Sequence, residues 1–412
     1  MGARWLSAVA VSIICFGNAC SRESKEENKA PATQTDLSPA TAPQEREIKI
    51  GQTMPYSGPA SAYGTIGKAQ AAYFKKINEE GGINGRKLTL LSSDDAYSPP
   101  KTVEQVRRLV EQEQVLMLFN SVGTAANSAV RGYLNEKKVP QLFVSTGATK
   151  WGDPEHFPWT IGFNPTYQLE GRTYAEHILK TNPKAKIAVL YQNDDYGKDL
   201  LKGLKDGLGD RVKMIVSEAT YEISDATIDS QIATLKSSKA DTFVDISTPK
   251  FAAQAIRKIH DIGWKPRHYL NNVGASIGSV LNPAGPEKAV GAMTIGYYKD
   301  PTDAQYDNDP EMQRYKAFLK KYYPEGDVAD AANAYAYIAA QTLVQVLKQC
   351  GEDVSRENII KQAASLKNFV PELLLPGVSI NTSPTDFFLF DSVRVSRFNG
   401  KNWVLEESAD KG

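Results

Sequence analysis

Short apolar runs that end in small hydroxyl or glycine residues recur along this chain, and each leads toward a helical pattern. The first is IKIGQTMPYSGPASAYG at 48–64, and others end at 94–95, 121–124 and 145–148. This strand–helix rhythm predicts a parallel sheet with helices on both faces. Open sheets of this kind bind ligands at the carboxyl ends of their strands, so we expect a binding site at this edge.

After a break at 151–165, the rhythm resumes and predicts a second sheet. Its expected strands lie at 187–191, 212–216, 243–246 and 269–273. A long helix is expected at 331–348, and its pattern does not assign it to either sheet. The alternating segment 387–406 turns at Asn399-Gly400, which is typical of a hairpin. The sequence therefore predicts two α/β lobes in series.

The length and charge of the chain exclude several classes of protein. Its 412 residues are enough for two domains or more. The 48 basic and 48 acidic residues balance, so no net field favours nucleic acid or an anionic surface. After residue 47, no stretch approaches the ~18–20 apolar residues of a membrane span.

The amino terminus predicts export. Arg4 precedes an apolar run at 5–16, which has the form of a secretory signal, and Gly-Asn-Ala-Cys ends at Cys20. This resembles a bacterial lipoprotein signal, with residues 1–19 removed and a lipid on Cys20. An ordinary signal peptidase could instead cut after Ala19. We expect a protein that is periplasmic or anchored to a membrane as a lipoprotein.

The segment 20–46 is expected to be a disordered tether. Its only large aliphatic or aromatic residue is Leu37, so it cannot bury enough surface to offset the entropy of ordering. With Cys15 removed and Cys20 lipidated, Cys350 is the remaining cysteine. We expect Cys350 to be a small buried apolar residue and no intramolecular disulfide to form.

The candidate motifs for catalysis and for cofactor binding are incomplete. The segment 274–278 reads G-x-S-x-G, but all four histidines precede Ser276, whereas a hydrolase with this motif needs its His later in the chain. At 62–69 the sequence lacks the first Gly and the final Ser or Thr of a phosphate-binding loop. Four scattered histidines give no metal-ligand spacing. The acidic pairs at 94–95 and 194–195 are more typical of helix caps than of catalysis.

A binding cleft is the function that these exclusions leave. Two lobes would face one another across a hinge, each with small polar groups at its strand ends. Trp151, Phe157 and Trp159 belong either to ordinary core or to the walls of this cleft. We expect no enzyme activity, no cofactor and no metal.

Several segments together resemble the solute-binding component of a branched-chain amino-acid type ABC transporter, a periplasmic binding protein of type I. They are GQTMPYSGPASAYG at 51–64, GGINGRKL at 81–88, Ser121 to Thr124, VSTGAT at 144–149, Asp195-Tyr196-Gly197 and VGAS at 273–276. The resemblance covers about 47–406. It implies two Rossmann-like lobes joined by three crossovers, at 161–165, 293–296 and near 382–387.

The resemblance also implies lobe boundaries and a set of ligand contacts. The amino-terminal lobe would comprise 47–163 and 295–384, and the carboxy-terminal lobe 164–294 and 385–407. A ligand carboxylate would lie on first-lobe loops, with aromatic and second-lobe groups around it. The implied contacts are Tyr63, Ser121, Thr146, Gly147, Ala148, Tyr196, Thr248 and Asn272. The family's first-lobe disulfide is absent here.

The place where amino-acid binders hold the ligand's ammonium reads Asn271-Asn272. Burying an ammonium without a countercharge costs several kcal/mol. Asp194 or Asp245 could supply that charge, but the family pattern does not place them there. We therefore expect an acid without an ammonium, an aromatic one for example, or an uncharged amide, in preference to a branched-chain amino acid.

Two functions fit this resemblance. The first is a monomeric transport receptor that delivers its ligand to a permease and an ATPase. The second is a sensor of the same fold that acts on a signalling partner. A sensor fused to its own output would carry a transmembrane helix or a signalling domain after residue 406, so transport is the favoured expectation.

Overall fold

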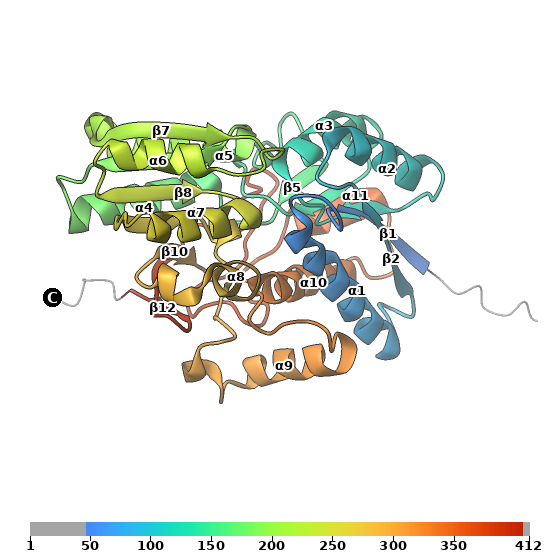
Figure 1. Cartoon of the computed structure of the whole chain (residues 1–412). Coiled ribbons are helices and arrows are strands. Elements are labelled where there is room, and N and C mark those ends of the chain that lie inside the picture. Colours follow the sequence, from blue (N-terminus) through green and yellow to red (C-terminus); the bar gives the residue numbers. More distant parts are fainter. Residues whose placement is uncertain (1–46, 407–412) are drawn as a thin grey trace, which may run out of the picture. The chain divides into compact units, whose positions relative to one another are not determined.

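The computed structural model describes residues 47–406, which form two α/β lobes, each built on one sheet (Figure 1). The predicted signal peptide and tether at 1–46 lie outside the described residues. The first sheet has the order β2-β1-β3-β4-β5 and all its pairs are parallel. The second has the order β12-β11-β10-β9-β8-β6-β7, parallel except for the antiparallel pairs that β11 makes with β10 and β12.

The strands of the first sheet are β1 (Glu47–Met54), β2 (Lys87–Asp94), β3 (Met117–Phe119), β4 (Gln141–Val144) and β5 (Thr160–Gly162). Those of the second are β6 (Ile187–Gln192), β7 (Ile215–Tyr221), β8 (Thr242–Ile246), β9 (Arg267–Leu270), β10 (Met293–Gly296), β11 (Arg394–Phe398) and β12 (Trp403–Leu405).

Helices cover both faces of the first sheet. One face carries α2 (Pro99–Glu111) and α3 (Thr124–Glu136), which pack through Val106 and Val130. The other face carries α1 (Gly64–Glu79), the long α10 (Ala331–Gln349), α9 (Pro310–Tyr322) and α11 (Arg356–Ala363). The predicted long helix therefore belongs to the first lobe, and Cys350 at its end is buried and free.

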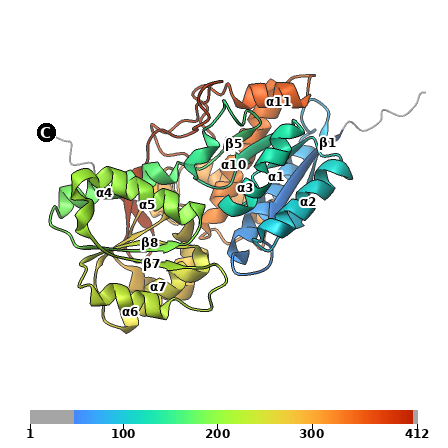
Figure 2. The ribbon, with the colours of Figure 1, turned by 90° about the horizontal axis from the view of Figure 1, so that it is seen from above.

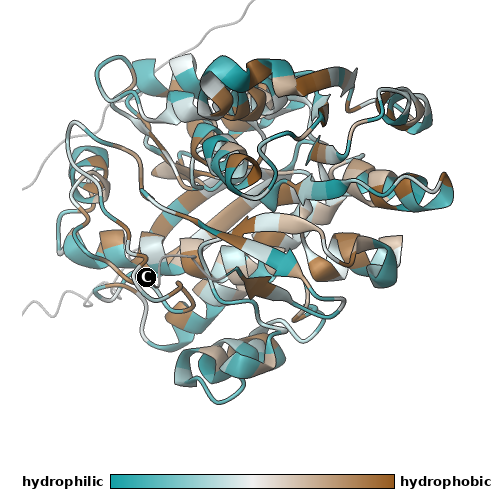
Figure 3. Cartoon of the chain, turned by 90° about the vertical axis from the view of Figure 1, so that its left-hand side faces the viewer, coloured by the Kyte–Doolittle hydropathy of each residue, from teal (hydrophilic) through white to brown (hydrophobic). Residues whose placement is uncertain are grey.

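The second sheet is covered in the same way (Figure 2). One face carries α4 (Tyr167–Thr181) and α5 (Asp195–Leu208), and the other carries α6 (Asp229–Ser237) and α7 (Pro249–Asp261). In α7, Pro249 occupies the first turn, where its missing N–H costs nothing. The next turns bury Phe251, Ala255 and Ile259 at helical spacing. In Figure 3 hydrophobic residues colour the interior strands brown, while much of the outer helix surface is teal.

Besides β10, which was expected to be a passage between the lobes, the predicted strands differ from the structure in three places. The segment 212–216 was expected to be a strand, but β7 begins at Ile215 and 209–214 is a 3₁₀ helix. The strand expected at 269–273 ends at Leu270, and Asn272–Gly274 forms a 3₁₀ turn. The break at 151–165 contains the short strand β5, whose three residues give no periodicity. The hairpin turn at Asn399-Gly400 lies where the sequence predicts it.

The chain passes between the lobes three times, and two passages lie slightly later than expected. β10 belongs entirely to the second sheet, so the second passage follows Gly296. Phe387, Leu389 and Phe390 are buried with first-lobe residues, so the third passage follows residue 390. We use "first lobe" for the five-stranded sheet with α1–α3 and α9–α11, and "second lobe" for the seven-stranded sheet with α4–α7.

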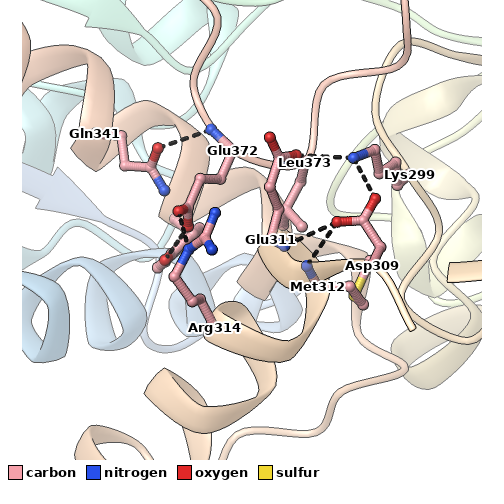
Figure 4. Close-up of polar contacts among 9 residues, drawn as sticks. Lys299, Asp309, Glu311, Met312, Arg314, Gln341, Glu372 and Leu373 are labelled. Carbon is pink, nitrogen blue, oxygen red and sulfur yellow. Dashed lines mark hydrogen bonds and ion pairs between the residues drawn. The ribbon is translucent and has the colours of Figure 1, made fainter. Parts of the chain in front are cut away.

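An ion-pair network fixes the second passage to α9 (Figure 4). The Lys299 Nζ donates to Asp309 at 2.6 Å and to Glu311 at 2.8 Å, and Glu311 also accepts from the backbone N–H of Leu373 at 3.1 Å. Burial tends to lower the pKa of Lys299, but its two carboxylate partners outweigh this and raise the pKa overall. The network thereby ties the second passage and the start of α9 to Leu373, which lies 62 residues after Glu311.

Replacing Lys299 by Met should lower the free energy of unfolding by about 2 kcal/mol, because it leaves two partly buried carboxylates without their cation. Chemical denaturation measures this. Lys316→Met is the matched control, since Lys316 pairs with Asp307 on an exposed surface, where such pairs contribute about 0–1 kcal/mol. Equal losses in the two variants would contradict a structural role for the network.

Candidate ligand-binding cleft

A cavity lies between the two lobes at the carboxyl ends of their strands. The space open to the centre of a water molecule is about 70 Å³, several times the ~10–15 Å³ that one water needs. Its lining comes from both lobes: Ala62, Tyr63, Ile66, Tyr97, Val122, Gly123, Thr124, Ser145, Thr146, Asn164, Tyr167, Tyr196, Thr248, Pro249, Asn272, Val273, Ser276, Ser279, Tyr298, Asp330, Ala331, Ala332 and Tyr335.

The first lobe supplies neutral hydrogen-bonding groups. Gly123 is the N-cap of α3, with φ of 103°, and Thr124 begins that helix. The Oγ1 atoms of Thr124 and Thr146 lie 2.6 Å apart, and Ser145 stands beside them in the lining. The first N–H groups of a helix have no partner within it, and its dipole favours negative charge there. This corner of the cavity suits a carboxylate or an amide oxygen.

Six tyrosines form the aromatic wall of the cavity, and burial raises the pKa of each, so their phenols stay neutral at ordinary pH. The Tyr63 hydroxyl donates across the cleft to the carbonyl of Val273 at 3.0 Å. The Tyr196 hydroxyl donates to the side chain of Asn271 at 2.9 Å. The remaining four are Tyr97, Tyr167, Tyr298 and Tyr335.

Asp330 is the one carboxylate among these lining residues, and none of them is Lys, Arg or His. It caps α10, is 7% exposed, and burial raises its pKa against the opposing effect of its hydrogen bonds. Its Oδ1 accepts from Ser276 Oγ at 2.8 Å, Ser279 Oγ at 3.2 Å and the Ala332 N–H at 3.2 Å. All three donors go to Oδ1, so Oδ2 keeps its capacity to accept from a ligand.

Five of the eight residues predicted as ligand contacts line the cavity: Tyr63, Thr146, Tyr196, Thr248 and Asn272. The other three lie behind the wall. Ser121 Oγ accepts from the Thr53 N–H at 3.0 Å, and Gly147 accepts from the Tyr167 N–H at 2.6 Å. Ala148 is buried in a cluster with second-lobe residues.

Most of the lining residues that were not predicted lie near predicted ones in sequence, but five come from late segments: Tyr298, Asp330, Ala331, Ala332 and Tyr335. Asp330, Tyr298 and Tyr335 follow the second sheet in sequence but reach the cleft because the chain returns to the first lobe. The sequence around Asp330, an Asp before an apolar periodic run, indicates a helix N-cap, and Asp330 is the N-cap of α10. Nothing local indicates that it also faces a ligand.

The G-x-S-x-G segment forms the contact that holds the lobes together at one end of the cleft. Ser276 caps a single π-helical turn at Ile277–Leu281 and donates to Asp330 of the first lobe. The Gly278 N–H donates to the carbonyl of Ala329 at 2.8 Å. A Cβ on Gly278 would lie 2.7 Å from Asp327 Oδ2 and 2.8 Å from the Asp330 nitrogen. The motif therefore serves close approach between lobes, and no His joins Ser276 in the cavity lining.

Gly278→Ala should obstruct this closed contact and weaken ligand binding about tenfold or more, since overpacking costs about 1–3 kcal/mol. The measurement is the affinity for the solute that most stabilises the unmodified protein. Gly132→Ala on α3 is the control, because a Cβ there meets nothing within 4 Å. Unchanged affinity in Gly278→Ala would show that the lobes need not approach this closely.

A buried carboxyl supports Asn272 from behind the cavity. Glu170 is 2% exposed and accepts from the Asn272 N–H at 2.7 Å and from the Tyr174 hydroxyl at 2.6 Å. Burial raises the pKa of Glu170 to about 7, and these two hydrogen bonds limit the rise. The native state therefore holds this proton to higher pH than the unfolded chain does.

A raised native pKa means that Glu170 costs stability as pH rises from about 4.5 to above 7, by up to about 3 kcal/mol. Glu170→Gln removes this titration, so its free energy of unfolding relative to the unmodified protein should increase across that interval. Denaturant unfolding at pH 5 and pH 8 measures the difference. If the difference in free energy of unfolding between the variant and the unmodified protein were the same at both pH values, Glu170 would not titrate in this interval.

Residues 47–406 contain neither a membrane-spanning helix nor a metal-ligand cluster. No helix there has the length and hydrophobicity of a transmembrane segment. No three His, Cys, Asp or Glu side chains there come together as metal ligands could.

The comparison with known families agrees with this geometry. Residues 47–401 match the family model described as Periplasmic binding protein, and the chain belongs to that family. The predicted two-lobed fold and the prediction of a binding protein in place of an enzyme are thereby confirmed. Membership implies an exported, periplasmic protein. The proposed lipid site, Cys20, lies outside the described residues.

Individual relatives are distant but match over most of their length. The chain is 26% identical over 336 residues to "Leu/Ile/Val-binding protein homolog 1" of Brucella suis biovar 1, covering 79% of this chain and 85% of the relative. A possible leucine/isoleucine/valine-binding protein from Rhodopirellula baltica superimposes with a TM-score of 0.79 at 19% identity, covering 89% and 98%. A branched-chain amino acid ABC transporter protein from Thermus thermophilus with bound valine gives 0.79 at 16%, covering 88% and 96%.

Proposed function

We propose that this protein is the extracytoplasmic receptor of an ABC importer, which captures a small organic solute between its lobes and delivers it to a permease and its ATPase. The observation that carries the proposal is the cavity between the lobes, which both lobes line with neutral donors, tyrosine rings and one carboxylate. The names of the relatives, which refer to leucine, isoleucine and valine binding, support a solute of this size.

Each wall of the cavity has a separate role in this proposal. The hydroxyls of Thr124 and Thr146, with the amino terminus of α3, hold a carboxylate or amide of the ligand. The tyrosines enclose its apolar part, with Tyr63 on the first lobe and Tyr196 on the second. Asn272 and Thr248 complete the second-lobe side. Cys20 carries a lipid, 20–46 tethers the lobes to the membrane, and the receptor acts as a monomer.

The charge of the ligand depends on Asp330. An acid without an ammonium, or an amide, is favoured by the absence of an acidic side chain at Asn271-Asn272. Asp330 supplies a carboxylate from the opposite lobe, with Oδ2 free to accept. A buried unpaired carboxylate beside a ligand carboxylate is costly, whereas an ammonium compensates it. We therefore propose an amino-acid-like ligand and keep the acid without an ammonium as its direct competitor.

A thermal-shift screen of matched pairs tests the charge of the ligand, for example phenylalanine with 3-phenylpropanoate and leucine with 4-methylpentanoate. The amino acid of a pair should raise the melting temperature more, because at equal concentration the ligand that binds the native state more tightly stabilises it more. Asp330→Asn should weaken amino-acid binding by about 10–100-fold, the equivalent of about 1.5–3 kcal/mol for a hydrogen bond to a charged group.

Ser355→Ala, which removes the N-cap of α11 far from the cleft, is the control for stability loss at a helix cap. If the acids bind as tightly as their amino-acid partners, or if Asp330→Asn improves binding of the acids, the ligand lacks an ammonium. If no solute of either class stabilises the protein, the transport proposal loses its ligand class.

A sensor of the same fold remains the second candidate, because capture of a solute serves transport and sensing alike. Co-purification with a permease favours transport, and co-purification with a signalling protein favours sensing.

A further inference from the structure

A second cavity lies beside the ligand cavity, on the side where the chain passes between the lobes. It offers about 60 Å³ to water centres, nearly as much as the first. Protein interiors contain few voids larger than one water molecule, so a space of this size between packed lobes calls for an occupant. Its lining is Asn272, Ala275, Ile277, Thr294, Ile295, Gly296, Tyr298, Asp300, Pro301, Gln305, Tyr306, Ala329, Ala331, Leu375, Ser396, Trp403 and Leu405.

Only three residues, Asn272, Tyr298 and Ala331, belong to the walls of both cavities. Asn272 belongs to the second lobe, Tyr298 to the second passage and Ala331 to the first lobe. Only these three separate residues, and no continuous backbone segment, are shared by the two linings. The Asn272 side chain is held aside by a hydrogen bond to the carbonyl of Ile295 at 2.9 Å. Ala331 contributes only a methyl group. The partition between the cavities is therefore thin.

The two cavities differ in chemistry. Aliphatic and aromatic side chains dominate the second, including Ile277, Leu375, Trp403 and Leu405. Its one charged residue, Asp300, is already paired, because it accepts from the Trp403 N–H at 2.8 Å and from the Thr302 N–H at 2.9 Å. The first cavity keeps an unfilled carboxylate oxygen on Asp330, whereas the second presents no unpaired charge and suits an uncharged, apolar group.

We propose that the second cavity binds the apolar tail of the ligand whose polar head occupies the first. The ligand is then an amphipathic solute with an unbranched alkyl or narrow aryl tail that passes between Asn272 and Tyr298. This inference rests on the proposed function, because it gives a binding site to the apolar half of the same ligand. It predicts that affinity grows with tail length well beyond the size of a branched-chain amino acid.

Two unbranched series from four to eight carbons test the tail site by calorimetry. One consists of 2-amino acids, from 2-aminobutanoate to 2-aminooctanoate, and the other of the corresponding carboxylates. In whichever series binds, affinity should rise by about threefold per methylene up to eight carbons, as expected for burial of apolar surface. Affinity that peaks at five or six carbons and then falls would overturn the proposal.

Two substitutions fill the second cavity from opposite lobes without altering a residue of the first. Leu375→Phe does so from the first lobe and Ser396→Leu from the second. Each should weaken binding of the eight-carbon compound by about tenfold or more, which offsets roughly two methylenes, and leave the four-carbon compound within about twofold. Ala233→Met, on the exposed face of α6, is the matched control and should change neither.

Equal loss at both lengths, or no loss at eight carbons, would overturn the tail site while the transport proposal stands. If neither series binds, the ligand class of the proposed function is wrong and the tail site falls with it. The thermal-shift screen distinguishes these cases, because it detects ligands of any tail length.

Discussion

The contact between the second-lobe turn at 274–279 and the amino terminus of α10 is the interaction on which the closed cleft depends. Gly278 can approach the carbonyl of Ala329 because it has no side chain, and this approach brings Ser276 and Ser279 onto Asp330. Asp330 thus lines the cavity and also holds the lobes together through one of its oxygens. In the proposed function, closure and recognition of the ligand's charge therefore share a single side chain.

Local patterns were sufficient for most of the scaffold. β4 ends just before the small residues at 145–148 where the sequence predicts a strand end, because its residues are all buried and Ser145 follows them. β7 was misplaced because alternate residues along this edge strand are exposed. An apolar run at 212–216 therefore gave a stronger signal than the true strand, whose position is set by its pairing with β6. Pairing between strands is a tertiary property that a sequence window does not contain.

In the site, too, some residues were predictable from local sequence and others depend on tertiary structure. Tyr63, Thr146, Tyr196, Thr248 and Asn272 lie at strand ends and helix starts, where topology alone predicts a ligand edge. Asp330 and Tyr298 depend on the return of the chain to the first lobe, which local periodicity cannot reveal. The expectation of a ligand without ammonium followed from reading the countercharge at one position, 271–272. The structure offers a carboxylate from the opposite wall, and electrostatic compensation depends on distance in space.

The hairpin of β11 and β12 completes the edge of the second sheet with residues 394–405, although most of that sheet lies between 187 and 296. Between them the chain builds α9, α10 and α11 of the first lobe. During synthesis or passage through a membrane, neither lobe can reach its full set of contacts until almost the whole chain has emerged. The interleaving thus ties the completion of each lobe to the completion of the other.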